Sequence, residues 1–168
     1  ETDNPVILEN RRQRMKAMIS TLLLSFGTPM MLAGDEFAHS QFGNNNPYCQ
    51  DNVLTWIAWD AISKEDKEQV KFVRRVIGLR KKLRIFNRRH FFIGKVVKNG
   101  YKDIAWYNER GAEMAANDWH DGNRKALSYC VYTGSRFVLA IFNANHDDMS
   151  WKLPEISGNL SWNLLLDS

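Results

Sequence analysis

The chain has 168 residues, of which 44% are hydrophobic, 12% aromatic and 25% charged, with a formal net charge of +4. This composition excludes a disordered tail and supplies enough apolar residues for a buried core, in one domain or two small ones. The longest apolar runs are well short of the ~20 residues of a membrane helix, so no membrane partner is expected.

The cysteines and histidines favour a reducing compartment and no metal. Cys49 and Cys130 lie far apart, without the CxxC spacing or the cysteine density of a disulfide framework. A cytoplasmic location is therefore predicted. No zinc-type spacing joins the four histidines to each other or to the cysteines, and no metal site is expected at His39, His90, His120 or His146.

The first predicted element is a helix that begins near Pro5 and ends at Gly27. Asn4 can cap it, and proline is favoured at the first helical position. Apolar residues recur at intervals of three, four and seven along its second half, at Met15, Met18, Ile19, Leu22, Leu23 and Phe26.

A buried strand is predicted next. Thr28 to Ala33 is apolar at both odd and even positions, as in a parallel strand buried on both faces, and Gly34-Asp35-Glu36 stands where it would end. In an α/β barrel, the carboxyl ends of the strands carry the functional residues. Asp35 and Glu36 are adjacent, so they do not suit the opposed carboxyl pair of a glycosidase. No catalytic residue is therefore predicted here.

The loop that follows, residues 41–51, is rich in amides around a tyrosine. Amides match sugar hydroxyls as donors and acceptors, and an aromatic ring packs against the apolar face of a sugar. An alternative stays open, because asparagine and aspartate also stabilise turns through bonds to nearby backbone. On the first interpretation the substrate-binding residues are Asp35, Glu36, His39, Asn44, Asn45, Asn46, Tyr48, Gln50 and Asp51.

A second helix is predicted from Ser63, which with Asp66 forms a capping-box pattern. A basic cluster near its end carries no intervening acid and comprises Arg74, Arg75, Arg80, Lys81, Lys82, Arg84, Arg88 and Arg89. Such a cluster has the chemistry to contact phosphates. Cations also complement the C-terminal end of a helix dipole, and a net charge of +4 is mild, so nucleic acid is not predicted as a partner.

The hydrophobic period changes to two after Asn87, which predicts antiparallel strands in a β-sandwich. Thr133-Gly134-Ser135 is predicted to form a short hairpin loop. No helix-length pattern interrupts the strands. We expect them at Phe91–Val97, Asp103–Tyr107, Ala126–Tyr132, Arg136–Asn143 and Leu160–Leu166.

Three segments carry a family resemblance: GTPMMLAGDE from Gly27, GNNNPYCQDN from Gly43, and DIAWYNERGAEMAANDW from Asp103. They resemble the C-terminal part of glycogen debranching enzymes of the isoamylase type, in the α-amylase superfamily of glycoside hydrolases. The resemblance implies cleavage of α-1,6-glucosidic branch linkages in glycogen or limit dextrin, without an organic cofactor. The partners it implies are an α-glucan and the rest of the parent enzyme's barrel.

In that family the catalytic carboxylates lie upstream of the region that this chain resembles, so the chain alone is predicted to be inactive. The predicted fold class is α/β plus all-β. Residues 1–86 would form the end of a TIM-type (β/α)8 barrel, with its last strand, site loop and flanking helices. Residues 87–168 would form an incomplete antiparallel β-sandwich. The alternative is a noncatalytic glucan-binding or interface module, in which exposed tryptophans of the β half would contact sugar.

Overall fold

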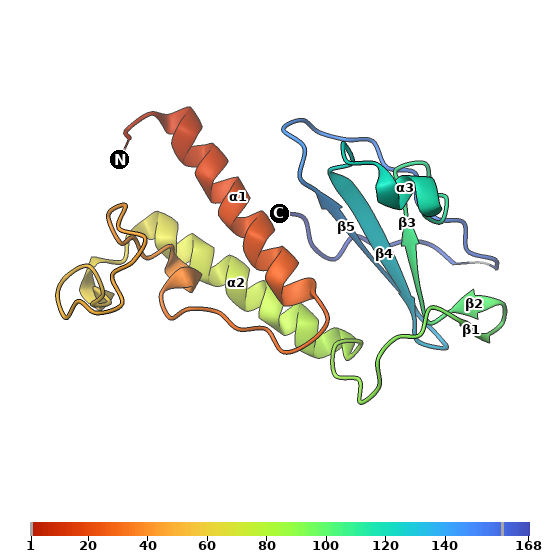
Figure 1. Ribbon diagram of the computed structural model, residues 1–168. Helices are drawn as coiled ribbons and strands as arrows, with labels where there is room; N and C mark the ends of the chain where they lie inside the picture. Colours follow the sequence, from red (N-terminus) through yellow and green to blue (C-terminus); the bar gives the residue numbers. More distant parts are fainter. Residues whose placement is uncertain (1, 159) are drawn as a thin grey trace. The chain divides into compact units, whose positions relative to one another are not determined.

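A computed structural model describes residues 2–158 and 160–168 of the chain (Figure 1). The chain forms two compact units. The first comprises Glu1–Phe86 together with Leu164–Ser168, and the second comprises Asn87–Asn163. Among the described residues, no helix is both long and apolar enough to cross a membrane.

Two long helices dominate the first unit, as the sequence predicted. Helix α1 spans Pro5–Leu24, and the Asn4 side chain accepts hydrogen bonds from the amides of Val6 and Ile7. Helix α2 spans Lys64–Leu83. Its capping box is complete, because the Ser63 hydroxyl accepts from the Asp66 amide at 3.0 Å and the Asp66 carboxylate accepts from the Ser63 amide at 3.1 Å.

The two helices lie side by side and run in the same direction (Figure 1). Contacts between them advance along both helices together: the Lys16 ammonium lies over the Phe72 ring, and a buried cluster follows further along each helix. A parallel pair requires the connecting chain to return along their length. The cluster consists of Ile19, Leu23, Val73 and Val76.

Arg80 of α2 satisfies the backbone carbonyl groups at the end of α1. Its guanidinium donates to the carbonyl oxygens of Leu23 at 2.5 Å, Ser25 at 2.8 Å and Gly27 at 2.6 Å. The last carbonyls of a helix have no partner within the helix, so a cation with several donors is well suited to them. The same guanidinium lies 4.4 Å from the centroid of the Phe86 ring.

The segment predicted as a buried strand, Thr28–Ala33, forms no strand in the structure. Met30 and Leu32 are 87% and 63% exposed. A strand needs a hydrogen-bonded neighbour, and the described part of the first unit contains no other strand beside which these residues could lie. The prediction was wrong for the fold of this chain, although the segment is extended and apolar. Two short 3-10 turns, η1 (Asp35–Phe37) and η2 (Trp59–Ala61), follow it.

The segment predicted as the last strand, Leu160–Leu166, is not a strand either. Residues 164–168 instead belong to the first unit, where Leu166 packs against the buried helix cluster. The Arg75 guanidinium donates to the Leu165 carbonyl at 2.9 Å. Leu166 thus contacts the helix pair and does not pair in a sheet, while Leu160, Leu164 and Leu165 are exposed.

The second unit contains two antiparallel sheets. Strands β3 (Ile104–Tyr107), β4 (Ala126–Tyr132) and β5 (Phe137–Asn143) form the larger sheet in the order β3-β4-β5. Strands β1 (Val96–Lys98) and β2 (Tyr101–Lys102) form a separate hairpin. The antiparallel pattern is confirmed, and β4 has the predicted bounds.

Three details of the second unit differ from the sequence prediction. Only the last two residues of the predicted strand Phe91–Val97 are in a strand, since Gly94 interrupts it with a φ of +64°. The hairpin strand β2 was not predicted. A five-residue helix, α3 (Ala116–His120), lies where no helix was expected.

A polar network holds the connection between β3 and β4. Asn108 is 1% exposed, and its side-chain oxygen accepts from the amides of Arg110 and Ala112. Arg124 forms ion pairs with both Glu109 and Asp118. These hydrogen bonds and ion pairs hold the loop conformation, although the buried Nε atom of Arg124 has no partner among the described residues. Asn108, Glu109 and Asp118 of the third resembling segment therefore have structural roles.

We expect Arg80→Ala to lower the free energy of unfolding by about 2–3 kcal/mol, because it leaves three carbonyl groups without their charged donor. The matched control is Arg74→Ala, an exposed arginine on the same helix, which should change the free energy of unfolding by less than about 0.5 kcal/mol. Urea unfolding followed by circular dichroism measures both. Equal effects of the two substitutions would contradict the capping role of Arg80.

The two cysteines should differ in reactivity. Cys130 is buried on β4, and burial raises the pKa of its thiol to about 12, while Cys49 is exposed. In native buffer near pH 8, a thiol reagent should modify Cys49 rapidly and Cys130 only after denaturation. The thiol's pKa is higher in the folded chain than in the unfolded chain. Its stabilising contribution is therefore complete below about pH 9 and is lost as the pH rises toward about 12. Rapid native labelling of both cysteines would contradict this.

Candidate functional site

The polar loop after residue 33 begins with a tight turn that the acidic residues themselves stabilise. The Asp35 carboxylate accepts from the Leu32 amide at 3.2 Å, and the Glu36 carboxylate accepts from the Gly34 amide at 2.9 Å. Phe37, at 6% exposure, anchors the turn and packs against the Trp59 ring at 5.5 Å between centroids. Both carboxylates thus support the backbone of the turn, whereas both were predicted from the sequence as substrate-binding residues.

Gly34 allows His39 to fold back over the turn. A Cβ at Gly34 would lie 2.7 Å from the His39 Cβ, and Gly34 has a φ of +105°. The His39 amide donates to the Gly34 carbonyl at 3.0 Å. The His39 Nε2 atom is buried and has no hydrogen-bond partner within the described residues. His39 also lines the neighbouring hollow.

An open hollow of about 430 Å³ lies beside this turn. It brings together four of the predicted substrate-binding residues, Asp35, His39, Asn44 and Asn45. Leu32, Ser40, Gln41 and Gly43 complete its lining. Ser40 and Gln41 were not predicted as site residues, although both are polar and lie shortly before the asparagine run.

The other five predicted residues do not line the hollow: Glu36, Asn46, Tyr48, Gln50 and Asp51. The Asp51 carboxylate accepts from the Trp56 indole nitrogen at 2.7 Å, and the Gln50 side-chain oxygen accepts from the side-chain Nδ2 of Asn52 at 3.1 Å. Tyr48 is 84% exposed. Hydrogen bonding to the local chain therefore explains part of the amide-rich sequence.

Within the asparagine run, the residues have different surroundings. The Asn44 side-chain oxygen accepts from the Asn46 amide at 2.9 Å, which closes a turn of the kind that asparagine favours. Asn45 is exposed and lines the hollow. The turn interpretation therefore holds for Asn44, while the Asn45 side chain is exposed at the hollow.

The basic cluster is partly occupied by contacts within each unit. Arg75 and Arg80 bind backbone carbonyls, while Arg88 pairs with the buried Asp103 carboxylate at 3.5 Å and lies over the Phe92 ring at 3.9 Å. These three guanidinium groups are engaged in the fold. Across residues 2–158 and 160–168, no three histidine, cysteine or acidic side chains gather closely enough to hold a metal ion.

We expect Gly34→Ala to destabilise the first unit by about 2–4 kcal/mol, because the new methyl group meets the His39 side chain and the backbone is left-handed. Gly43→Ala is the matched control. Gly43 also has a positive φ, +84°, but a Cβ added there would have no neighbouring atom within 4 Å. Gly43→Ala should lower the free energy of unfolding by only about 1–2 kcal/mol. Thermal unfolding measures the stability of both variants. An identical loss of stability would show that His39 does not pack on Gly34.

Comparison with known proteins gives a consistent set of relatives. No protein-family model matches the chain. The chain is 37% identical, over 182 aligned residues, to proteins from Mycobacterium tuberculosis and Mycobacterium bovis named glycogen operon protein GlgX homolog. That alignment covers 99% of this chain and 25% of each relative. A Salmonella typhi protein named glycogen debranching enzyme is 36% identical over 149 residues, which cover 89% of this chain and 21% of that protein. The chain thus spans about a quarter of the length of these relatives.

Proposed function

This chain is homologous along nearly its whole length to bacterial glycogen debranching enzymes and GlgX homologues, and from that premise we propose that it forms part of a glycoside hydrolase of the isoamylase type. The substrate is an α-glucan, glycogen or its limit dextrin, and the bond cleaved is an α-1,6-glucosidic branch linkage. The single observation that carries this proposal is the level of sequence identity over 99% of the chain.

The first unit is the end of the catalytic (β/α)8 barrel in this proposal. Parallel helices joined by a returning extended segment are the arrangement expected of successive helices around a barrel. Residues 28–33 would become the last barrel strand once neighbouring strands supply hydrogen-bond partners. The exposed Met30 and Leu32 would then be covered. The second unit would belong to the β-sandwich that follows the barrel.

The hollow beside η1 would border the sugar site. His39 Nε2 and the Asn45 side chain would contact sugar hydroxyls, while Asp35 and Asn44 hold the loop conformation through their backbone contacts. The carboxylates of a retaining hydrolysis would lie upstream, as the resemblance implies. In this chain the Asp35 and Glu36 carboxylates both accept backbone amides within one turn. The chain alone is accordingly proposed to be inactive.

A second candidate function is a noncatalytic glucan-binding module. Trp119 is 52% exposed and packs edge-on against Trp106, with 5.8 Å between ring centroids. A partly exposed, rigidly supported indole is the kind of platform on which a sugar ring can stack. This function would need only the second unit.

The main proposal is tested by release of reducing ends from a branched limit dextrin. We expect activity from a longer chain that restores the upstream sequence and none from the 168-residue chain. In the longer chain, Asn45→Ala should raise KM about five-fold, because one hydrogen bond to the glucan is lost. Asn117→Ala, a change of the same kind on exposed α3, should leave KM unchanged.

Two results would contradict the proposal. Activity in the short chain would place catalytic carboxylates within it. If the longer chain is active and Asn45→Ala and Asn117→Ala have the same KM, the hollow does not border the substrate site.

A further inference from the structure

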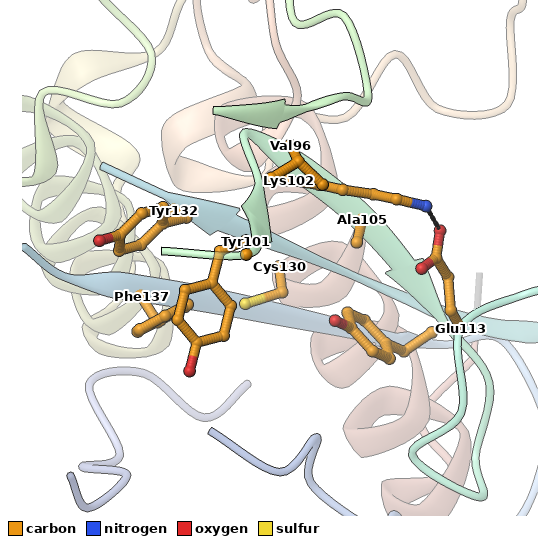
Figure 2. A pocket seen from close by; sticks show the side chains of 10 residues that line it. Val96, Tyr101, Lys102, Ala105, Glu113, Cys130, Tyr132 and Phe137 are labelled. Atoms are coloured by element: carbon orange, nitrogen blue, oxygen red, sulfur yellow. Dashed lines mark hydrogen bonds and ion pairs between the residues drawn. The ribbon is translucent and has the colours of Figure 1, made fainter. Parts of the chain in front are cut away.

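The second unit contains a separate pocket of about 130 Å³, between the β1–β2 hairpin and the β3-β4-β5 sheet (Figure 2). Side chains alternate along a strand, and Ala105 pairs with Cys130 in register, so both lie on the same face of the sheet. That face forms the floor of the pocket. Hairpin residues Val96, Gly100, Tyr101 and Lys102 form a wall.

Aromatic rings occupy one end of the pocket. Figure 2 shows Tyr101, Tyr132 and Phe137 grouped there. The centroid of the Tyr101 ring lies 4.7 Å from that of Phe137 and 5.2 Å from that of Tyr132. Tyr132 is buried, whereas Tyr101 and Phe137 remain partly exposed. These mutually braced rings therefore leave some aromatic surface open to the pocket.

Polar groups occupy the other end. The Lys102 ammonium pairs with the Glu113 carboxylate there, with Cys130 and Ala105 between this pair and the aromatic rings (Figure 2). The lysine and glutamate side chains are 36% and 47% exposed. A backbone bridge between Tyr107 and Glu113 holds the glutamate beside the sheet. The end of the pocket thus presents a donor and an acceptor that solvent can reach.

Tyr107 differs from the other two tyrosines that line the pocket. The Tyr101 hydroxyl accepts from the Ser157 amide at 2.9 Å, and the Tyr132 hydroxyl donates to the Gly134 carbonyl at 2.9 Å. The Tyr107 hydroxyl has no hydrogen-bond partner among the described residues. A tyrosine phenol is protonated at neutral pH and can donate a hydrogen bond, and burial raises the pKa of Tyr107 above its ordinary value.

We propose that this pocket binds one glucosyl unit of an α-glucan, as an accessory site apart from the hollow in the first unit. The volume, about 130 Å³, is below the roughly 300–1,000 Å³ of pockets for drug-sized ligands and suits a single small ring. Open aromatic surface complements the apolar face of the sugar, while Tyr107, Lys102 and Glu113 match its hydroxyls. The identity of the sugar rests on the proposed function, because the relatives are glycogen debranching enzymes.

The test is a titration of the isotope-labelled 168-residue chain with maltose, followed by NMR. We expect shifts at the amides of Ala105 and Cys130, which form the floor of the pocket. Sorbitol is the control ligand, because it has similar hydroxyl groups but no ring to pack against tyrosine. Shifts of equal size with sorbitol, or no shifts at the floor with maltose, would overturn the proposal.

Two substitutions locate the site. Tyr107→Phe keeps the ring and removes the free hydroxyl, and it should raise the maltose Kd about five-fold. Lys102→Met should raise it by a similar factor. The matched control Lys98→Met, on exposed β1 outside the pocket, should leave Kd unchanged. Exposed ion pairs contribute little stability, so Lys102→Met should remain folded. Equal Kd values for all three variants would overturn the assignment.

The same titration separates this inference from the proposed function. Shifts at Asn44 and Asn45 without shifts at Ala105 and Cys130 would overturn the accessory site and leave the debranching proposal intact. Shifts at the pocket floor, together with an inactive longer chain, would support the accessory site and contradict debranching.

Discussion

The fold of the first unit depends on one charged side chain from α2 that completes the end of α1. Ser25, at the end of α1, has extended backbone and supplies no glycine-type turn to satisfy the last carbonyls. The Ser25 amide and hydroxyl donate to the Leu22 and Thr21 carbonyls, and Arg80 supplies the donors for Leu23, Ser25 and Gly27. Because this contact joins the C-terminal ends of both helices, it fixes their parallel direction. The apolar cluster packs the same two helices against each other over the preceding turns.

Local chemistry made much of this structure predictable from sequence. Asn4 and the Ser63–Asp66 pair mark both helix starts, because capping is decided within four residues. Strand β4 was predicted to the residue, since its apolar run is bounded by turn residues and pairs with the adjacent β5. In the first unit and at the end of the chain, the failures were segments whose strand assignment depends on distant partners. Residues 28–33 and 160–166 have the composition of strands, but the composition of a segment does not determine whether a neighbouring strand is present to pair with it.

In the candidate site, too, the local chemistry could be predicted and the spatial arrangement could not. The sequence identified the loop and its chemistry, and four of nine predicted residues meet at one hollow. It could not separate Asn44 from Asn45, because both have the same side chain and only the backbone decides which one closes a turn. Nor could it reveal the unpartnered His39 nitrogen, which depends on the close approach to Gly34. The pocket of the second unit could not be predicted from the sequence either, because it is lined by residues from several strands and a loop.

The return of residues 164–168 to the first unit has a consequence for how the chain acquires its structure. The first unit is built from two stretches with the whole second unit inserted between them. During synthesis, α1 and α2 emerge first, yet the contact of Leu166 with their buried cluster forms only after the second unit has been made. Such sequence-distant closure is slow relative to local helix formation. The second unit, whose own contacts lie within one continuous stretch, can therefore fold without waiting for this last contact.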